Sequence, residues 1–592
     1  SGTSGGEIQV QARQFQLSSG SRMVSFTSGA LPGGDIAINA TESVELTGYG
    51  SFVENLDRIR SFKFTPAELG NGLFAFTFGQ GNAGNIFINT SRFTARNSAF
   101  ILASTFAAGK GGSVNVNATD SVQLDNSGLI SSNLPTSSGA VGNITINTRS
   151  LNFQNLGVAI GTTRATGAGG NITINASEQA EFIGFKLVSL PITGVSFNTG
   201  LISSSLADGD AGNIIVKTQR LLLLDGALMG AVVYGGGNGG NIIIDASESF
   251  EANSNNLFLS GMSSGAVGNA TGNSGNITIR TGRLLLANGS GVLTNTLGPG
   301  NGGNLEIEAS QGIQLIGLSG DGSTKSGFYA NGFGNSTGAA GDITITTPSL
   351  EVRDGAGILA NSLGKGTGGL VNINAGSILL DNEASLSADT RGIKNDPNRE
   401  QATINLRSQN LILRRNSSIT TNARGENVLG GNININTDTI VALENSDISA
   451  NSENFRGGQV NINAQAIFGT QYRTERSLES DITATGGTPD LSGTVQINTP
   501  DVQPASGLVE LSSNFSDISD RIATACPATK GNSFIITGRG GLPSDPTQPL
   551  IGSNVWRDVR PVIVGNRTSF SQSGIGNPRS AAPIIEAQGW EI

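Results

Sequence analysis

Residues 170–176 read Gly-Asn-Ile-Thr-Ile-Asn-Ala, and variants of this heptapeptide return along almost the whole chain of 592 residues. Six of the fifteen spacings between its copies are 28 residues, and one copy lacks the leading glycine. A period of about 20–50 residues that persists over hundreds of positions indicates a solenoid. The sixteen copies begin at Gly6, Gly34, Gly84, Gly112, Gly142, Gly170, Gly212, Gly240, Gly275, Gly303, Gly341, Gly369, Glu400, Gly431, Gly458 and Gly493.

Within each copy, apolar and polar residues alternate strictly. With the first residue counted as position zero, 30 of the 32 residues at positions two and four are Ile or Val, and the exceptions are Leu305 and Ala402. Positions one, three and five are mostly polar or charged. This pattern predicts a half-buried β-strand rather than a helix. Shorter strand patterns follow in each repeat, as at residues 92–96 and 99–104.

Three strands in about 28 residues predict one triangular coil. A single coil cannot bury its apolar face, so successive coils must stack in parallel. We therefore expect an all-β protein, a right-handed single-stranded parallel β-helix of about 16 coils over residues 1–500. Its length would be about 75–80 Å at the usual strand spacing. Longer intervals predict loop insertions at about 47–83, 183–207 and 315–337, and residues 501–592 are expected to cap the last coil.

Glycine and asparagine have separate expected roles in the coils. We expect the repeated glycines to occupy tight bends that need a positive φ, where asparagine is the next best residue. Asparagine also fills position five in ten copies, where stacked side chains could hydrogen-bond along the rod or simply tolerate a turn. These ladder candidates are Asn39, Asn89, Asn117, Asn147, Asn175, Asn374, Asn405, Asn436, Asn463 and Asn498.

The composition argues against most catalytic and binding chemistry. The chain has no histidine, which excludes Ser-His-Asp and Cys-His sites and histidine metal sites. Its acids are scattered along the coils, and even the close pair Asp208 and Asp210 lies in a glycine-rich turn. The net charge of −10 argues against nucleic acid, Cys526 has no partner for a disulfide, and no apolar run approaches a membrane span. We predict no enzyme activity, no metal and no cofactor.

One long insertion offers a candidate ligand contact. The interval from Gly34 to Gly84 is 50 residues and combines aromatic with basic side chains. Such a loop could hold an acidic glycan or a partner protein, or its aromatic residues could simply pack across the rod. The candidate residues are Tyr49, Phe52, Arg58, Arg60, Phe62, Lys63 and Phe64.

The chain resembles a known family of exported proteins. Its GGNITINA-type coils, together with the segment Phe-Ile-Ile-Thr-Gly-Arg-Gly-Gly-Leu-Pro at 534–543, resemble the filamentous haemagglutinin-like exoproteins of two-partner secretion. Residues 499–502, 522–526 and 586–590 are similar to the cyanobacterial branch of that family. The resemblance implies a pectin-lyase-like β-helix, secretion to the surface of a Gram-negative-type envelope, and an outer-membrane transporter as the export partner. The family's N-terminal secretion domain is not among these residues, so we expect a fragment or a processed chain.

Together these features predict a secreted or surface-exposed adhesive rod that presents loops to a cell surface, a matrix or a glycan. A polysaccharide lyase or hydrolase on the same fold is an alternative, which three carboxylates and an arginine on one face of adjacent coils would favour. A stalk that delivers a contact-dependent toxin is a second alternative.

Overall fold

The computed structural model describes residues 6–61, 70–134, 137–186, 197–254, 259–268, 270–334, 336–392 and 402–500. The chain divides into two units, Ser1–Pro504 and Ala505–Ile592, and all described residues belong to the first. The capping module predicted at 501–592 and the loop residues Phe62, Lys63 and Phe64 lie outside the described residues.

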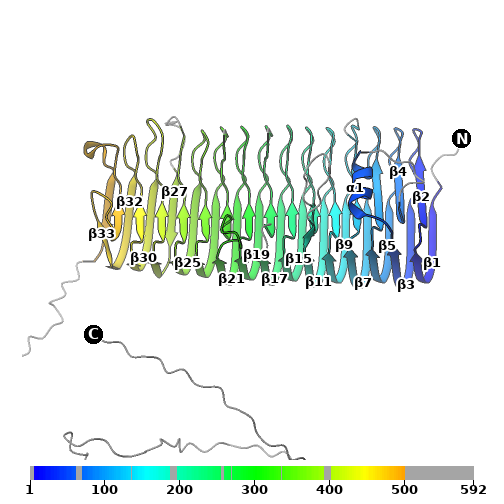
Figure 1. Cartoon of the computed structure of the whole chain (residues 1–592), viewed down its shortest axis with the longest axis horizontal. Helices are drawn as coiled ribbons and strands as arrows, with labels where there is room; N and C mark the ends of the chain where they lie inside the picture. The colour runs from blue at the N-terminus through cyan, green and yellow to red at the C-terminus, as the bar shows by residue number, and fades with distance from the viewer. Residues whose placement is uncertain are drawn as a thin grey trace, which may run out of the picture. The chain divides into compact units, whose positions relative to one another are not determined.

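The first unit is a parallel β-helix, as predicted, with its coils stacked side by side along one axis (Figure 1). The larger of its two long sheets, sheet A, has 17 strands; β27 and β28 belong to one coil, so the coils number sixteen. Its strands are β1 (Ile8–Leu17), β3 (Ile36–Thr47), β5 (Ile86–Arg96), β7 (Val114–Asp125), β9 (Ile144–Gln154), β11 (Ile172–Ile183), β15 (Ile214–Leu224), β17 (Ile242–Asn253), β19 (Ile277–Ala287), β21 (Leu305–Ile316), β23 (Ile343–Arg353), β25 (Leu370–Asp381), β27 (Thr403–Arg407), β28 (Asn410–Arg414), β30 (Asn432–Ala442), β32 (Gln459–Phe468) and β35 (Thr494–Asn498).

The second long sheet, sheet B, has 16 shorter strands, all paired in parallel. They are β2 (Arg22–Thr27), β4 (Gly72–Thr77), β6 (Phe100–Thr105), β8 (Gly128–Ile130), β10 (Val158–Ile160), β14 (Gly200–Ile202), β16 (Leu228–Gly230), β18 (Gly261–Ser263), β20 (Gly291–Leu293), β22 (Gly327–Tyr329), β24 (Gly357–Leu359), β26 (Ser385–Ser387), β29 (Ser418–Thr420), β31 (Asp447–Ser449), β34 (Ser480–Thr483) and β33 (Thr470–Tyr472).

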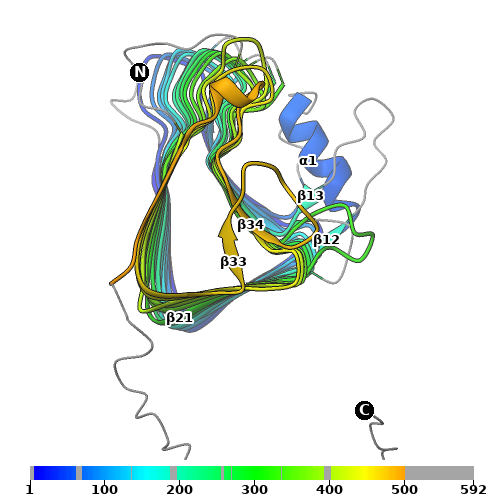
Figure 2. The same ribbon diagram turned by 90° about the vertical axis from the view of Figure 1, so that its left-hand side faces the viewer.

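Viewed along the stack, the coils form a three-sided ring (Figure 2). The first two strand patterns of a repeat are mostly joined into one long strand of sheet A, which bends where the register shifts, as between Thr90 and Arg92. Sheet A therefore forms two sides of the ring and sheet B the third. Among the coils whose two halves are both described, that of β27 and β28 is the one in which the halves form separate strands.

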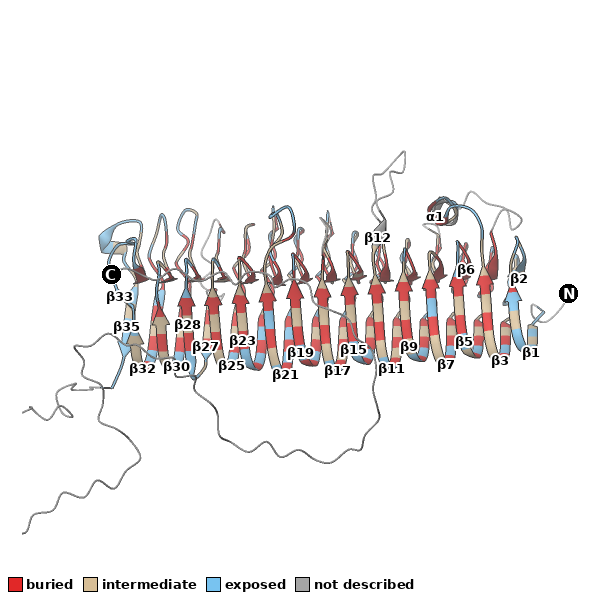
Figure 3. Ribbon diagram, turned by 60° about the horizontal axis from the view of Figure 1, so that its bottom comes forward, coloured by how far each residue is buried: buried red, intermediate tan, exposed pale blue. Residues whose placement is uncertain are grey.

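The core runs through the whole stack. Ile172 and Ile174, at positions two and four of their copy, are fully buried, and their register neighbours in the adjacent coils are fully buried too. Buried and more exposed residues alternate along the strands (Figure 3). Each buried aliphatic side chain contributes about 1.5–3 kcal/mol of transfer free energy. Since a strand contacts only its neighbours, this stabilisation is local to each pair of coils.

The repeated glycines are needed for close stacking, so the expectation that they adopt a positive φ is wrong. None of the fourteen glycines from Gly34 to Gly493 that begin a copy is among the residues with positive φ. A Cβ at Gly142 would lie 2.0 Å from the carbonyl oxygen of Gly112, the equivalent residue of the preceding coil. All but one of the asparagines with positive φ, such as Asn126, lie in the bends after the sheet A strands; the exception, Asn427, lies between β29 and β30, and none is at position five.

One copy of the repeat is displaced from its predicted position. Val371 pairs with Ile404 and Leu370 with Thr403, so the glycine position of this coil is filled by Ala402 and not by Glu400. With alanine in place of glycine, this copy lacks the residue that marks position zero in the other copies. Asn405 consequently lies at position three.

The three insertions differ in structure. The first contains α1 (Phe52–Ser61), which lies outside the ring (Figure 2). The second contains a short antiparallel pair, β12 (Phe185–Lys186) and β13 (Phe197–Asn198), and the third a turn closed by a bridge between Leu318 and Lys325. A 3-10 turn, η1 (Pro489–Leu491), precedes β35. None of the helices in the described ranges is long and apolar enough to cross a membrane.

Candidate functional site

The aromatic loop is partly used for packing. Phe52 is 2% exposed and stacks on Phe100, with ring centroids 5.0 Å apart and planes 7° from parallel. Tyr49, in contrast, is 62% exposed. Arg58 is exposed on α1, and Arg60 lies on the same helix, where its side chain is outside the described part. Phe52 therefore anchors α1 to the outer face of sheet B, and Tyr49 remains open to solvent.

The predicted asparagine ladder is present, but it is interrupted. Four amide-to-amide hydrogen bonds of 2.7–2.8 Å join five successive coils. A further bond of 2.8 Å joins Asn498 to Asn463. Asn405 belongs instead to a second ladder at position three, with Asn372, Asn434 and Asn461. The five residues of the first ladder are Asn39, Asn89, Asn117, Asn147 and Asn175.

A longer ladder at position one was not predicted. The side-chain oxygen of each residue in this column accepts a hydrogen bond from the backbone N–H one coil further on, as from Asn241 to Asn213 at 2.8 Å. The series runs through ten such steps, from Asp35 to Leu370. The repeated asparagine directly after the glycine was the sequence signal for it.

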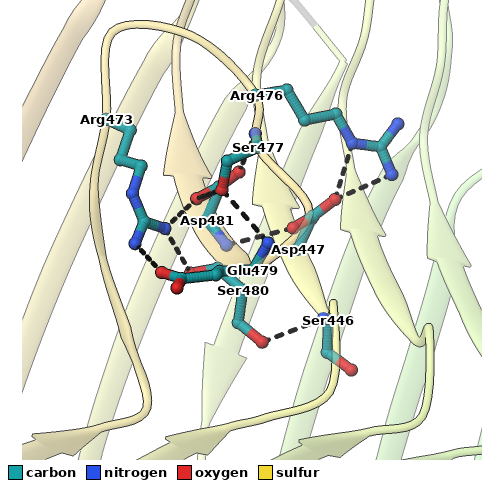
Figure 4. Close-up of polar contacts among 8 residues, drawn as sticks. All are labelled: Ser446, Asp447, Arg473, Arg476, Ser477, Glu479, Ser480 and Asp481. Atoms are coloured by element: carbon teal, nitrogen blue, oxygen red, sulfur yellow. Dashed lines mark hydrogen bonds and ion pairs between the residues drawn. The ribbon is translucent and has the colours of Figure 1, made fainter.

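Close to the last coils, three carboxylates and two arginines gather on one face (Figure 4). Asp447 begins β31, and Asp481 lies beside it on β34; they are 4% and 1% exposed. Arg473 forms ion pairs with Asp481 and Glu479, and the Arg476 guanidinium lies 2.8 Å from Asp447. Three of the acids that are separate in the sequence, Asp447, Glu479 and Asp481, are thus brought together here. The signal was the repeat of Ser-Asp-Ile at 446–448 and 480–482.

The two aspartates have pKa values shifted in opposite directions. Burial raises the pKa of Asp447, against the lowering effect of the Asp481 amide, which donates to it at 3.0 Å, and of Arg476. Burial acts in the same sense on Asp481, but the Ser477 amide and hydroxyl and the Arg473 guanidinium outweigh it and lower its pKa. Two neighbouring carboxyl groups whose pKa values are shifted apart are also found in the acid–base pairs of glycosidases.

Each carboxylate oxygen of Asp447 and Asp481 nevertheless already accepts a hydrogen bond. Asp481 accepts from Arg473 and twice from Ser477, and Asp447 accepts from Arg476 and the Asp481 amide. A buried carboxylate whose two oxygens are both hydrogen-bonded within the protein cannot reach a substrate unless its covering loop opens. The cluster chiefly fixes the loop from Arg473 to Glu479 against β34.

Two of the hollows on the outer faces of sheet A bear on function; a further one, over β19, β21 and β23, is lined by Arg280 and Glu308. One of the two, of about 480 Å³, includes Glu251 and Glu351. These two carboxylates lie three coils apart in one column, about 14 Å at the usual strand spacing. Glu351 accepts a hydrogen bond from Gln314 at 2.7 Å and pairs with Arg353 at 2.9 Å. The separation exceeds the roughly 5–9.5 Å that glycosidase carboxylates need.

The second hollow, about 420 Å³, is a trough over β23, β25, β27, β30 and β32. Its outward residues are threonines, asparagines and a single charged side chain, Arg407. The trough therefore presents amides, hydroxyls and one guanidinium to solvent.

No family model, no curated protein and no solved structure matches this chain. Among the described residues, no group of three or more His, Cys, Asp or Glu side chains could hold a metal ion.

Proposed function

We propose that this chain is the shaft of a secreted or surface-exposed adhesive rod and is not an enzyme. One observation carries the proposal: sixteen coils follow one another from β1 to β35 and present the same outward positions to solvent at every step.

The mechanism is mechanical and additive. A stack whose core is continuous from coil to coil holds its surface groups in fixed positions, about 4.8 Å apart along each column. A polymer with its own repeat can contact several coils at once, and the effective concentration of each further contact makes weak contacts add to a useful affinity.

We also propose that the rod acts outside the cell and is exported by an outer-membrane transporter of the two-partner type. The support is the resemblance of the coils and of residues 534–543 to that family. Protease treatment of intact cells, with and without the transporter, tests this part. If the protease failed to cleave the chain on intact cells that carry the transporter, the proposal of export would be contradicted.

A glycoside hydrolase is a second candidate, because Asp447 and Asp481 are register neighbours on adjacent strands and have pKa values shifted in opposite directions. Against it stand their burial and the arginines that cover them.

The experiment that separates the two is incubation of the purified chain with acidic and neutral polysaccharides, followed by size-exclusion chromatography. The adhesive rod predicts co-elution with an intact polymer. Shortened polymer that the double variant D447N/D481N no longer produces would assign a hydrolase instead.

A further inference from the structure

Short side chains line most of the trough along sheet A. In β21 the outward residues of the first half are Glu306 and Glu308, and in β23 they are Thr344 and Thr346. From β25 to β32 the same positions are asparagines, except at Arg407. The trough spans these five coils, about 19 Å along the rod, and Arg407 is its one long side chain.

The asparagines of position five occur in two different states. In the early coils each amide donates to the previous one, so that Asn117 donates to Asn89 and accepts from Asn147. In the trough, Arg407 stands between Asn374 and Asn436 in register and breaks this series. Among the described residues, neither Asn374 nor Asn436 has a side-chain hydrogen bond, so both amides can still donate and accept.

Arg407 differs from the equivalent arginine of another coil. Arg280 occupies the same column and forms an ion pair at 3.2 Å with Glu308 of the next coil. Arg407 is exposed, its column neighbours are neutral, and no ion pair or side-chain hydrogen bond reaches it within the described ranges. The floor beside it is rigid, because Asn372, Asn405 and Asn434 are joined by hydrogen bonds of 2.8 Å.

From this arrangement we infer that the trough is a binding site for an anionic polysaccharide, with Arg407 pairing with a carboxylate or sulfate group of the chain. A guanidinium binds either group through two parallel N–H donors. Asn374 and Asn436, one coil to each side, would hydrogen-bond the hydroxyl groups of the same polymer. The inference deepens the proposed function and rests on it.

The net charge of −10 does not forbid such a ligand. At physiological ionic strength, exposed charges are screened beyond about 8 Å. The nearest acid in the same column is Glu308, three coils and about 14 Å from Arg407, and it is already paired with Arg280.

The test is a titration of the full chain with three soluble polymers: polygalacturonate, dextran sulfate and neutral dextran. R407Q should weaken binding of the anionic polymer about tenfold or more, as expected for loss of a charged hydrogen-bonded pair. R280Q removes a similarly exposed arginine from the same column and should change affinity less than about twofold, since that arginine already has a partner. The double variant N374A/N436A should weaken binding while leaving its dependence on the anionic group in place. The preference between polygalacturonate and dextran sulfate identifies the group that is bound.

Equal losses in R407Q and R280Q would overturn the inference, because binding would then follow overall charge. Failure to bind either anionic polymer would also overturn the inference. If the chain then still bound neutral dextran or whole cells, the proposed adhesive function would remain supported. Shortening of the polymer would instead contradict the proposed function, whatever R407Q does.

Discussion

The carbonyl oxygen of Gly84 lies where a side chain on Gly112 would have to start: a Cβ there would be 1.9 Å away. Every coil-to-coil contact at position zero repeats this approach, with the departure at Ala402. There the hydrogen bond from the Thr403 N–H to the Gly369 oxygen is 3.4 Å, against 2.8 Å one coil later. A single methyl group is thus accompanied by a local widening of the stack.

Replacing Gly112 with alanine should accordingly destabilise its coils by about 1–3 kcal/mol or more, the usual cost of overpacking. Native-state hydrogen exchange in β5 and β7 measures the loss. Gly230→Ala is the control, because no atom lies within 4 Å of its added Cβ, and it should be neutral or slightly stabilising. Similar losses in both variants would show that close stacking is not the reason for the glycines.

The anchor of α1 gives a second prediction. Phe52→Ala should cost about 3–5 kcal/mol of the free energy that docks the helix, as for other buried phenylalanines. Limited proteolysis within residues 47–83 should then become much faster. Tyr49→Ala, at an exposed position, should leave the cleavage rate unchanged. If Tyr49→Ala released the helix as well, the separation of packing and exposed residues in this loop would be incorrect.

Removing one amide from the ladder should have a graded effect. Asn117→Ala deletes two hydrogen bonds, each worth about 0.5–1.5 kcal/mol. Asn436→Ala deletes none among the described residues and should be close to neutral for stability. Exchange rates of the amides in β7 and β30 compare the two. If the two substitutions changed the protection of these amides against hydrogen exchange by the same amount, the ladder would add no stability.

An aspartate within another column of asparagines makes stability depend on pH. The Asp389 carboxylate accepts from the Asn422 N–H at 2.7 Å, and Asn361 accepts likewise from the Asp389 N–H. Burial raises the pKa of Asp389, although its hydrogen bonds and Arg424 act to lower it. A raised folded-state pKa means that the folded state gains stability as pH falls through that value.

Asp389→Asn keeps the acceptor oxygen without the charge, so it should stabilise β26 and β29 at neutral pH and remove this dependence. Asn361→Asp, the reciprocal change, should destabilise the same region at neutral pH and less so in acid. Urea unfolding of both variants between pH 4 and pH 8 provides the measurement. A stabilising Asn361→Asp would contradict the burial argument.

Replacing Asp481 and replacing Asp447 with asparagine should have different effects on stability, because the pKa values of the two aspartates are shifted in opposite directions. The pKa of Asp481 is lowered, so its ionised form stabilises the fold at neutral pH, and this contribution is lost as pH falls through its folded-state value. Asp481→Asn should therefore expose the loop from Arg473 to Glu479 to proteases at pH 7. Asp447→Asn should be neutral or stabilising, since the pKa of Asp447 is raised and an amide oxygen can still accept from the Asp481 N–H.

The sequence was sufficient for the coils and their number, because each coil has its own β-branched face and the signal is local. It was insufficient where the cause lies between coils. The role of the glycines depends on the oxygen of a residue about 28 positions away, and Asp447 meets Asp481 only through the stack. Phe52 could be identified as aromatic, but its burial depends on Phe100 in the next coil. The free state of Arg407 likewise follows from its neighbours in register, which a single copy of the repeat does not reveal.

The last strand of a parallel sheet has unpaired backbone N–H and C=O groups along its outer edge. A strand from a second molecule can add to this edge. In sheet B, the outer edge of β34 is already paired with β33. β33 precedes β34 in the chain yet pairs with its far edge, and Arg473, the residue after β33, is tied to Asp481. The protein thus supplies three of its own residues where a foreign strand would begin a fibre, and end-to-end polymerisation through sheet B would first have to displace them.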